Sequence, residues 1–363
     1  MVSLRLVDNE YPFDGFDHTR LIARGIVLND EGKVALHVVH RDDAFCNQTY
    51  YETPGGGVDE GESFAEAFER ECMEELGAKV QILAVLGEIE DAYNLIHRKN
   101  INRFYLAKVV QSGKPHFASK GDSYIQKTEW LGLEDAIAKM EKQDDNLVAG
   151  LVKRRELPIL QEVRRLRDVH KISWSNGPLH RGTKRLETPR LLLRRFEDID
   201  AEMMFANWAG DKDATEFLEW PAHANADVTK SVISVWCSKY GDPTFYQWII
   251  EEKKIKEPIG SISVIHSDFD AFEIGFVIAK SHWDQGYATE ALEAVRKYLF
   301  EEVGVSLLWG KHDVDNPHAG RVMVKAGFRF KEMRPHGGFD QRGVCDVDVY
   351  EMTKSEYAAL KGR

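Results

Sequence analysis

The sequence predicts a mixed α/β (α+β) protein of two domains, and three observations support this class. The chain has 363 residues, which is more than one ordinary hydrophobic core accommodates. In both halves, short apolar runs bounded by turn residues alternate with stretches whose apolar residues recur at helical spacing. Residues 172–184 show no such period and contain Gly177, Pro178 and Gly182, which break regular structure. We therefore expect domains at residues 1–170 and 185–363, joined by a linker at 171–184.

Composition and charge exclude several classes of protein. A hydrophobic content of 43% with 30% charged residues is typical of a globular protein in water. The net charge of −12 argues against a general nucleic-acid or anionic-membrane binder. Apolar runs are too short to span a bilayer, and Asp8, Glu10 and Asp14 interrupt any signal-like segment. Four cysteines without CxxC spacing read as free thiols, so we expect a cytoplasmic location.

The first half is rich in strands and ends in helices. Residues 20–40 read as a β-hairpin, because apolar runs at 21–28 and 34–39 flank a polar turn ending in Gly32. Further strands are predicted at 48–53, 80–86, 84–90, 103–110 and 128–131. A helix is predicted at 133–140, followed by a helical stretch at 147–169 that Pro158 interrupts.

A helix at residues 64–76 is the best-defined element of this half. Ser63 and Glu66 form a capping box, which sets the start of the helix, and Gly77 is the residue that ends it. An apolar stripe runs along Phe64, Phe68, Cys72 and Leu76.

Three carboxylates lie together at the C-terminal end of this helix. Glu74 and Glu75 follow Glu71 by three and four residues, so the carboxylates share a face. Like charges repel at this spacing, and the carbonyl end of a helix disfavours anions. The cluster therefore favours a bound cation, and hard oxygen ligands without a nearby histidine indicate Mg²⁺ or Mn²⁺ rather than zinc.

The surrounding residues extend this cluster to a known signature. Together they resemble the motif of the Nudix hydrolases at every defined position: Gly56, Glu62, Arg70, Glu71, Cys72, Glu74, Glu75, Gly77 and Ala78. The resemblance implies an α/β/α sandwich that hydrolyses a nucleoside diphosphate linked to another group X. It also implies a metal held by Glu71, Glu74, Glu75 and the Gly56 carbonyl, with Glu71 and Glu75 catalytic.

The same resemblance suggests supporting roles. Arg70 would orient the acids through its guanidinium group, and Glu62 would support the loop or a bound water. The general base stays open among the helix acids and three residues outside the motif: Glu88, Glu90 and Glu129. Arg41 and Glu52 are candidate substrate contacts, although an exposed surface arginine is an alternative for Arg41. Tyr93 lies where some members of the family place a base-stacking aromatic.

The second half opens with a turn and a strand at 186–194, followed by a helix from about Asp198. Strands are predicted at 248–252, 260–266 and 272–278, and a helix with apolar spacing follows Gly286. A strand, a glycine-containing turn and a helix N-terminus together form an anion site of free N–H groups.

The order of motifs from residue 185 to 352 resembles the GNAT-type N-acetyltransferases, most of all the branch with ribosomal-protein N-terminal acetyltransferases. The matching segments are residues 186–193, 273–276, 283–292, 315–316 and 325–328. The resemblance implies a mixed-sheet fold and acetyl-CoA as the acetyl donor. Two positions depart from the usual pattern, namely Trp283 in the acetyl-CoA loop and Ala319 where many members carry serine.

The resemblance also implies site residues in this half. The pyrophosphate of acetyl-CoA would lie on Gln285, Gly286, Tyr287 and Ala288 near Thr289. Its pantetheine arm would run beside Phe276, Val277 and Ile278, with Asn316 as a further contact. Glu273 is the candidate base that removes a proton from the amine, and the N–H near Val277 would stabilise the oxyanion. Trp220, His223 and Tyr246 are candidate acceptor contacts, with aromatic core as the alternative.

The sequence thus predicts a bifunctional enzyme with a nucleoside-diphosphate-type substrate, acetyl-CoA and an amine acceptor. A second copy of the chain is retained as a candidate partner. The rival hypothesis is a regulator, in which one domain binds a ligand only and controls the other. The identities of X, of the nucleobase and of the acceptor stay open.

Overall fold

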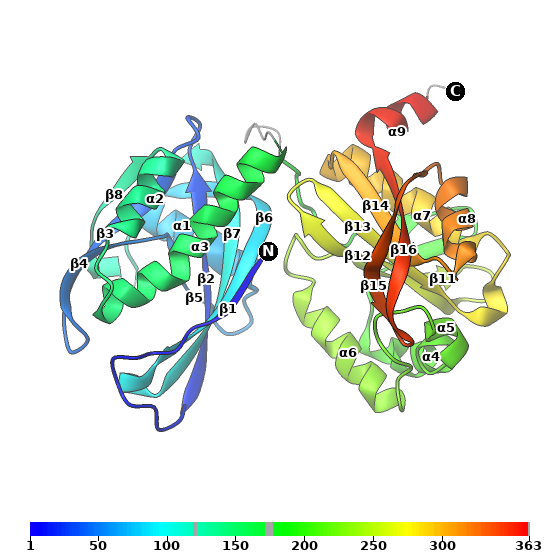
Figure 1. Cartoon of the computed structure of the whole chain (residues 1–363), viewed down its shortest axis with the longest axis horizontal. Helices are drawn as coiled ribbons and strands as arrows, with labels where there is room; N and C mark the ends of the chain where they lie inside the picture. The colour runs from blue at the N-terminus through cyan, green and yellow to red at the C-terminus, as the bar shows by residue number, and fades with distance from the viewer. Residues whose placement is uncertain (119–121, 171–176, 362–363) are drawn as a thin grey trace. The chain divides into compact units, whose positions relative to one another are not determined.

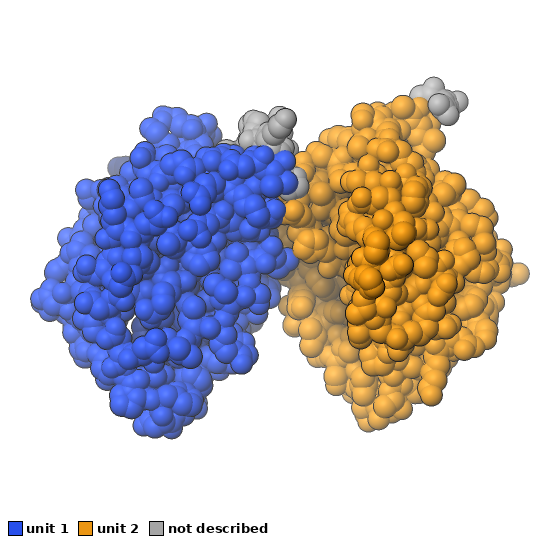
Figure 2. All heavy atoms as spheres, viewed as in Figure 1, with its two compact units in different colours: residues 1–177 blue, residues 178–363 orange. Residues whose placement is uncertain are grey.

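The computed structural model describes residues 1–118, 122–170 and 177–361. The chain divides into two compact units, residues 1–177 and 178–363 (Figure 2). Within the predicted linker at 171–184, residues 171–176 lie outside the described part. His180 and Thr183, from the same segment, are buried in the second unit. The Thr183 hydroxyl accepts a hydrogen bond from the Gln247 backbone at 2.8 Å, so the second unit begins before residue 185.

The described part of the first unit contains one eight-stranded mixed sheet, in which the main path runs β1-β6-β7-β2-β3-β4 (Figure 1). Its strands are β1 (Val2–Arg5), β2 (His18–Leu28), β3 (Val34–Asp42), β4 (Asn47–Glu52), β5 (Gly55–Gly57), β6 (Ala78–Tyr93), β7 (Arg98–Ser112) and β8 (Ile125–Leu131). The strands predicted from sequence are confirmed, and the two predicted at 80–86 and 84–90 are parts of the single strand β6.

The predicted hairpin at residues 20–40 is wrong in its pairing. Strands β2 and β3 follow each other, but they pair only at Leu28 and Val34. Strand β3 uses one edge for β8 and the other for β4, which leaves little of it for β2. Strand β2 pairs instead with β7 in parallel over its whole length, and with β5 from Ile22 to Arg24. This places the glycines of β5 next to the centre of the sheet.

Helices cover both faces of this sheet. They are α1 (Phe64–Leu76), α2 (Leu133–Glu141) and α3 (Leu147–His170). A Cβ atom on Gly25 of β2 would lie 2.6 Å from the ring of Phe68, which belongs to α1. Gly25 therefore faces α1. The preceding residue, Arg24, lies 3.9 Å from Glu156 of α3, and neighbouring residues of a strand point to opposite faces. The predicted α/β/α sandwich is therefore confirmed.

Helix α3 corrects one further prediction. Pro158 lies inside it, and the helix continues on both sides. A proline in a helix removes one backbone hydrogen bond, and here buried packing outweighs that loss. Ile159, Leu160 and Val163 behind it are fully buried.

The second unit is also built on a mixed sheet, whose eight strands in the described residues run in the order β15-β16-β14-β13-β12-β11-β10-β9. The strands are β9 (Leu186–Glu187), β10 (Leu191–Arg194), β11 (Gln247–Glu252), β12 (Glu257–Asp268), β13 (Ala271–Ile278), β14 (Leu307–Asp313), β15 (Arg329–Asp340) and β16 (Gly343–Thr353). The helices that flank it are α4 (Ala201–Met204), α5 (Lys212–Thr215), α6 (Ala226–Lys239), α7 (Tyr287–Tyr298), α8 (Pro317–Lys325) and α9 (Lys354–Lys361). The predicted strands and the helix after Gly286 are confirmed, and so is the mixed α/β class.

One pair of strands opens the middle of this sheet. Strands β13 and β14 are parallel, but their pairing stops after Glu273 and Trp309. Residues 274–278 of β13 therefore have no partner on the β14 side. Helix α7 packs on one face through Leu292 and Val295, whereas Val277 belongs to the core cluster of the opposite face. Among the described residues, no helix is both long and apolar enough to cross a membrane.

Candidate active sites

The acid helix α1 of the first unit is held at both ends as the sequence predicts. Both hydrogen bonds of the capping box are present between Ser63 and Glu66. Gly77 closes the helix in the left-handed conformation, with φ of 62°. These caps fix where the helix ends, and therefore where its last acidic side chains lie.

Arg70 ties the acids of the helix to the preceding loop. Its guanidinium group donates two 3.0 Å hydrogen bonds to the carboxylate of Glu62. It also donates to Glu71 at 2.9 Å and to the carbonyl of Gly57 at 2.8 Å. Glu74 lies 3.6 Å from the same guanidinium group. One arginine therefore lies against three carboxylates, and its orienting role in a reaction stays a prediction.

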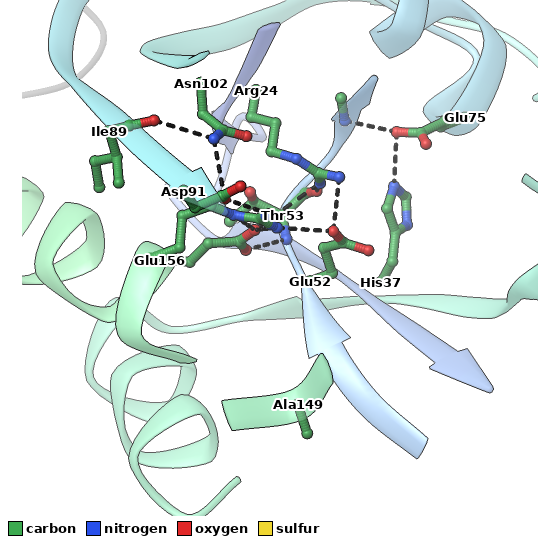
Figure 3. Close-up of polar contacts among 12 residues, drawn as sticks. Arg24, His37, Glu52, Thr53, Glu75, Ile89, Asp91, Asn102, Ala149 and Glu156 are labelled. Atoms are coloured by element: carbon green, nitrogen blue, oxygen red, sulfur yellow. Dashed lines mark hydrogen bonds and ion pairs between the residues drawn. The ribbon is translucent and has the colours of Figure 1, made fainter. Parts of the chain in front are cut away.

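Glycines of β5 bring the main chain against the acids. A Cβ atom on Gly56 would lie 2.4 Å from a carboxylate oxygen of Glu71, which leaves no room for a side chain. The backbone N–H of Gly55 donates to Glu75 at 2.8 Å. His37 of β3 lies 3.1 Å from the same Glu75 oxygen (Figure 3), so the expectation that no histidine lies near the acids is wrong. Glu71, Glu75 and the β5 backbone thus form one compact oxygen-rich centre.

This centre fits a hard divalent cation. Glu71 and Glu75 are buried side by side, each 7% exposed. Burial, reinforced by the charge of Glu75, raises the pKa of Glu71 to about 7. Two buried carboxylates at one helix end repel each other unless a positive charge lies between them. Carboxylate and backbone carbonyl oxygens are the ligands that Mg²⁺ and Mn²⁺ take.

A cavity of about 610 Å³ opens beside the acid cluster. Predicted residues that line it include Arg41, Glu52, Gly56, Arg70, Glu71, Glu74, Glu75 and Tyr93. Arg41 is not an exposed surface side chain, because it donates to Asp43 at 2.6 Å and lies 4.6 Å from the Phe45 ring centroid. Glu52 is paired at 2.6 Å with Arg24 and at 2.9 Å with Arg155. Although burial acts against ionisation, these two arginines lower the pKa of Glu52.

A buried ionic network forms one wall of this cavity. Figure 3 shows Arg24, Glu52, Asp91 and Glu156 pointing toward one another from β2, β4, β6 and α3. Arg155, which is 1% exposed, lies 2.7 Å from Glu156 and 3.2 Å from Asp91. Such buried pairs hold their elements in one arrangement, because removing one partner leaves an uncompensated charge.

The second unit has its own buried acid. Glu273 lies at the last paired position of β13 before the strands separate, and its side chain lines a cavity of about 400 Å³. It is 6% exposed, and its Oε1 atom has no hydrogen-bond partner in the described part of the chain. Burial raises the pKa of Glu273 to about 7, while Lys311 acts to lower it and Glu219 to raise it. A carboxyl group with this pKa can accept a proton near neutral pH.

A second cavity, of about 490 Å³, lies along the free edge of β13 and the start of α7. The predicted acetyl-CoA contacts that line it are Phe276, Val277, Ile278, Gly286, Tyr287, Ala288, Thr289 and Asn316. Gln285 is outside this lining, and its carbonyl accepts a 2.9 Å hydrogen bond from Arg190. Gly286 caps the helix with φ of 78°, and no side chain caps the N–H groups that follow. Free N–H groups at a helix start attract anions.

Two family models match the chain at these two sites. The model of the NUDIX domain matches residues 18–151, and the model of the acetyltransferase (GNAT) domain matches residues 190–329. The chain joins a Nudix domain to a GNAT acetyltransferase domain. The corresponding prediction from sequence is confirmed, including that both parts are of enzyme families.

Several proteins are similar to part of the chain. An uncharacterized N-acetyltransferase, YoaA of Bacillus subtilis (strain 168), is 29% identical over 47% of this chain and 96% of its own length. The uncharacterized N-acetyltransferase p20 of Bacillus licheniformis is 22% identical over 48% of this chain and 98% of its own length. A solved structure of a putative ribosomal-protein-serine acetyltransferase from Vibrio cholerae is 17% identical, covers 47% of this chain and 97% of its own, and has a TM-score of 0.42. The ribosomal-protein branch stays a prediction.

Within the Nudix domain, residues outside the motif also reach the cavity. Arg20, Arg24, Arg98, Asn100 and Arg155 line it, and none of them was selected from the sequence. The sequence does contain a pattern that could have pointed to them, namely polar residues at every second position of a strand. Arg20 and Arg24 lie on one face of β2, and Arg98 and Asn100 lie on one face of β7. The three candidate bases outside the motif do not line the cavity. Glu88, Glu90 and Glu129 pair instead with Arg103, Lys99 and Lys139.

Within the GNAT domain, only one of the three predicted acceptor contacts lines the cavity that contains Glu273. Trp220 lines the cavity with Glu273, whereas His223 and Tyr246 do not. Tyr246 is 1% exposed in the hydrophobic core, which agrees with the aromatic-core alternative. Trp283 donates its indole N–H to the Ile278 carbonyl at 2.7 Å, so it fixes the end of β13. Ala319 lines both cavities and offers no polar group there.

Proposed function

We propose that the Nudix domain hydrolyses a nucleoside diphosphate linked to a group X, with Mg²⁺ or Mn²⁺. The observation that carries this proposal is that the main chain at Gly56 lies so close to the Glu71 carboxylate that a side chain would not fit between them. The backbone therefore lies directly beside the buried pair Glu71 and Glu75. The complete acid set also favours catalysis over ligand binding alone. Glu71, Glu74, Glu75 and the Gly56 carbonyl would hold the ion. It would offset the charge of the pyrophosphate and make a water molecule more acidic.

The protein side chains orient this centre. Arg70 holds Glu62 and Glu71, and its loss would let both carboxylates rotate. His37 and the Gly55 N–H fix Glu75. Glu71 and Glu75 are our catalytic residues, and the general base lies among the acids of α1. Arg41 and Glu52 are our candidate substrate contacts, because both line the cavity.

The test is product release from nucleoside diphosphate derivatives with Mg²⁺, in the full chain and in Glu75→Gln. We expect the variant to lose roughly 10²–10⁴-fold in rate. Glu69→Gln is the matched control, because this exposed residue lies on the same helix and outside the cavity lining. Tight nucleotide binding without turnover in the unmodified chain would instead support the regulatory alternative.

We propose that the GNAT domain transfers the acetyl group of acetyl-CoA to an amine. The free edge of β13 would bind the pantetheine arm like an added strand. The N–H groups at the start of α7, on Gly286 to Ala288 and near Thr289 and Gln285, would bind its pyrophosphate. Phe276, Val277, Ile278 and Asn316 complete the proposed binding residues.

Glu273 is our proposed base for this reaction. The carboxylate takes a proton from the ammonium form of the acceptor, and the neutral nitrogen attacks the thioester carbonyl. The C–S bond then breaks, the CoA thiolate leaves, and the extra proton on the newly acylated nitrogen passes to that thiolate or to water. The backbone N–H near Val277 would stabilise the negative oxygen during attack.

Free-thiol release from acetyl-CoA with a panel of amines tests this activity. Glu273→Gln is expected to lower the rate by about 10²-fold or more, because glutamine cannot accept the proton. An unchanged rate in the variant would remove Glu273 from the mechanism. Glu257→Gln serves as the control, since that glutamate is exposed on the neighbouring strand β12.

A further inference from the structure

Two arginines of the Nudix cavity have no partner of opposite charge. Arg20 of β2 and Arg98 of β7 both line the cavity, yet neither has a carboxylate within ion-pair distance among residues 1–118 and 122–170. The remaining arginines of the lining are each paired with an acid, namely Arg24, Arg41, Arg70 and Arg155. Arg20 and Arg98 therefore leave two positive charges that no carboxylate of the described residues neutralises.

Strand pairing brings these two arginines together. In the parallel pair β2–β7, Arg20 lies opposite Asn100, and Arg98 is two residues earlier on the same face of β7. Arg98 lies with its guanidinium carbon 5.0 Å from the Tyr93 ring centroid, and its Nε atom is buried without a hydrogen bond. The Oδ1 atom of Asn100 is also buried and unpartnered, although its amide group donates to Asp91 at 2.5 Å. The site thus offers two cationic groups around a free acceptor.

Such an arrangement is unfavourable in the absence of an anion. Burial and the charge of Arg20 lower the pKa of Arg98. The partly buried Arg98 guanidinium group has lost water, and apart from the Tyr93 ring it has gained no carboxylate partner among the described residues. An anion between the two arginines would satisfy the N–H donors of both, and arginine recognises phosphate oxygens in this way.

The position of the pair relates it to the acid cluster. The neighbouring glycines of β5 face different groups, because a Cβ atom on Gly56 would meet Glu71, and one on Gly57 would lie 2.7 Å from the Arg20 guanidinium. Neighbouring residues of a strand point to opposite faces, so the arginine pair and the acids lie on opposite sides of β5 and line the same cavity. A bridging pyrophosphate carries about two negative charges, which the proposed divalent ion offsets. Two unpaired arginines then match the negative charge of a further phosphate, which is about −1.5 to −2 at pH 7 for a terminal phosphate and about −1 for a bridging one.

We propose that Arg20 and Arg98 bind a phosphate of X, so that the substrate carries at least one phosphate beyond the pyrophosphate linkage that is cleaved. This inference rests on the proposed hydrolase function, and it narrows X to an anionic group. Two sources share this chemistry: a nucleoside triphosphate, in which X is phosphate itself, and a dinucleoside polyphosphate.

The first experiment measures binding without turnover. Inorganic tripolyphosphate is titrated calorimetrically into the full chain at low salt, with and without Mg²⁺, and into Arg98→Gln, Arg20→Gln and Arg98→Lys. We expect each glutamine variant to bind about tenfold more weakly, and Arg98→Lys to recover part of the loss. Lys99→Gln is the matched control, because it removes the same charge from the adjacent residue, which pairs with Glu90 and does not line the cavity. No binding to the unmodified chain, or equal binding to all variants, would overturn the proposal.

The second experiment compares substrates. The rate kcat/KM is measured with nucleoside triphosphates, with dinucleoside tetraphosphates, and with nucleoside diphosphate sugars, in which X is uncharged. We expect the unmodified chain to favour one of the two anionic classes, and Arg98→Gln to reduce that preference at least fivefold relative to the sugars. Equal losses for all substrates would overturn the proposal, because the arginines would then contact the shared pyrophosphate. If tripolyphosphate binding depends on Arg98 but no nucleotide is hydrolysed, the anion subsite stands and the proposed hydrolase function fails.

Discussion

Replacing Glu273 by glutamine should make the GNAT domain more stable at alkaline pH while it removes acetyl transfer. The carboxyl group is 6% exposed, and its pKa is raised to about 7 by burial. The charged and titratable groups that act on it are Lys311 of β14, Arg334 of β15 and Glu219, which itself pairs with Lys311 at 3.2 Å. None of these cations lies within ion-pair distance of Glu273 in the described residues, so burial dominates.

The magnitude follows from the difference between folded and unfolded states. A rise in the pKa of Glu273 from the ordinary 4.5 to about 7 corresponds to roughly 3 kcal/mol, since each pKa unit is worth about 1.4 kcal/mol. Water in the adjoining cavity screens the charge, which reduces this to the order of 1–2 kcal/mol. Because the folded pKa lies above the unfolded one, the favourable contribution is complete below about pH 4.5 and is lost as the pH rises through 7. Glutamine does not titrate, so it keeps that contribution.

The assay is urea unfolding at pH 5 and pH 8, followed by fluorescence of the eight tryptophans, with Glu257→Gln in parallel. We expect Glu273→Gln to gain of the order of 1–2 kcal/mol relative to the unmodified chain at pH 8 and much less at pH 5. Acetyl transfer by the unmodified chain should rise between pH 6 and 8 as the base ionises. A stability difference that is the same at both pH values would refute the raised pKa. A pH-rate profile unchanged in Glu273→Gln would refute the role of the base.

Three further predictions concern the Nudix domain. Gly56→Ala should lower hydrolysis at least tenfold, because the new Cβ would displace Glu71, while acetyl transfer by the same variant stays unchanged. Arg155→Met should destabilise this domain by about 3–5 kcal/mol in calorimetric unfolding, whereas Arg164→Met on the same helix, whose side chain is 40% exposed, should cost less than about 1 kcal/mol. Saturating Mg²⁺, at about a hundred times its Kd, should stabilise the unmodified domain by about 2.7 kcal/mol, and Glu75→Gln should lose most of that gain.

The acid helix could be predicted from sequence because everything that fixes it is local. Ser63, Glu66 and Gly77 set its ends, and spacings of three or four residues put Glu71, Glu74 and Glu75 on one face. Glu273 could be chosen for a similar reason, since it lies inside a recognisable strand. Its burial, however, depends on the separation of β13 from β14, which are more than thirty residues apart along the chain.

The arginine lining could not be predicted, because it depends on pairings between distant segments. Arg20 and Arg98 come together only because β2 pairs with β7, whereas the sequence favoured pairing of β2 with β3. The turn after β2 is correctly formed, with Gly32 donating to the Asn29 carbonyl at 2.9 Å. A good turn therefore indicated that two strands are consecutive, but it did not determine that they share an edge. Arg155 lines the cavity only because the helix predicted at 147–169 packs against β4 and β6, which its own sequence does not specify.

The two domains use the same property, a buried carboxylate, with opposite arrangements of charge around it. In the Nudix domain, Glu71 lies 2.9 Å from Arg70 and has two further acids on its own helix. One arginine does not balance three carboxylates, so the cluster favours binding of a cation. In the GNAT domain, Glu273 has neither a paired cation nor an adjacent acid on its strand, so its free oxygen is available to a proton. Removing charge at the first centre should weaken ion binding, and removing it at the second should alter a pH profile. Glu75→Gln and Glu273→Gln in the same full chain should therefore abolish one activity each, by effects that Mg²⁺ titration and pH titration separate.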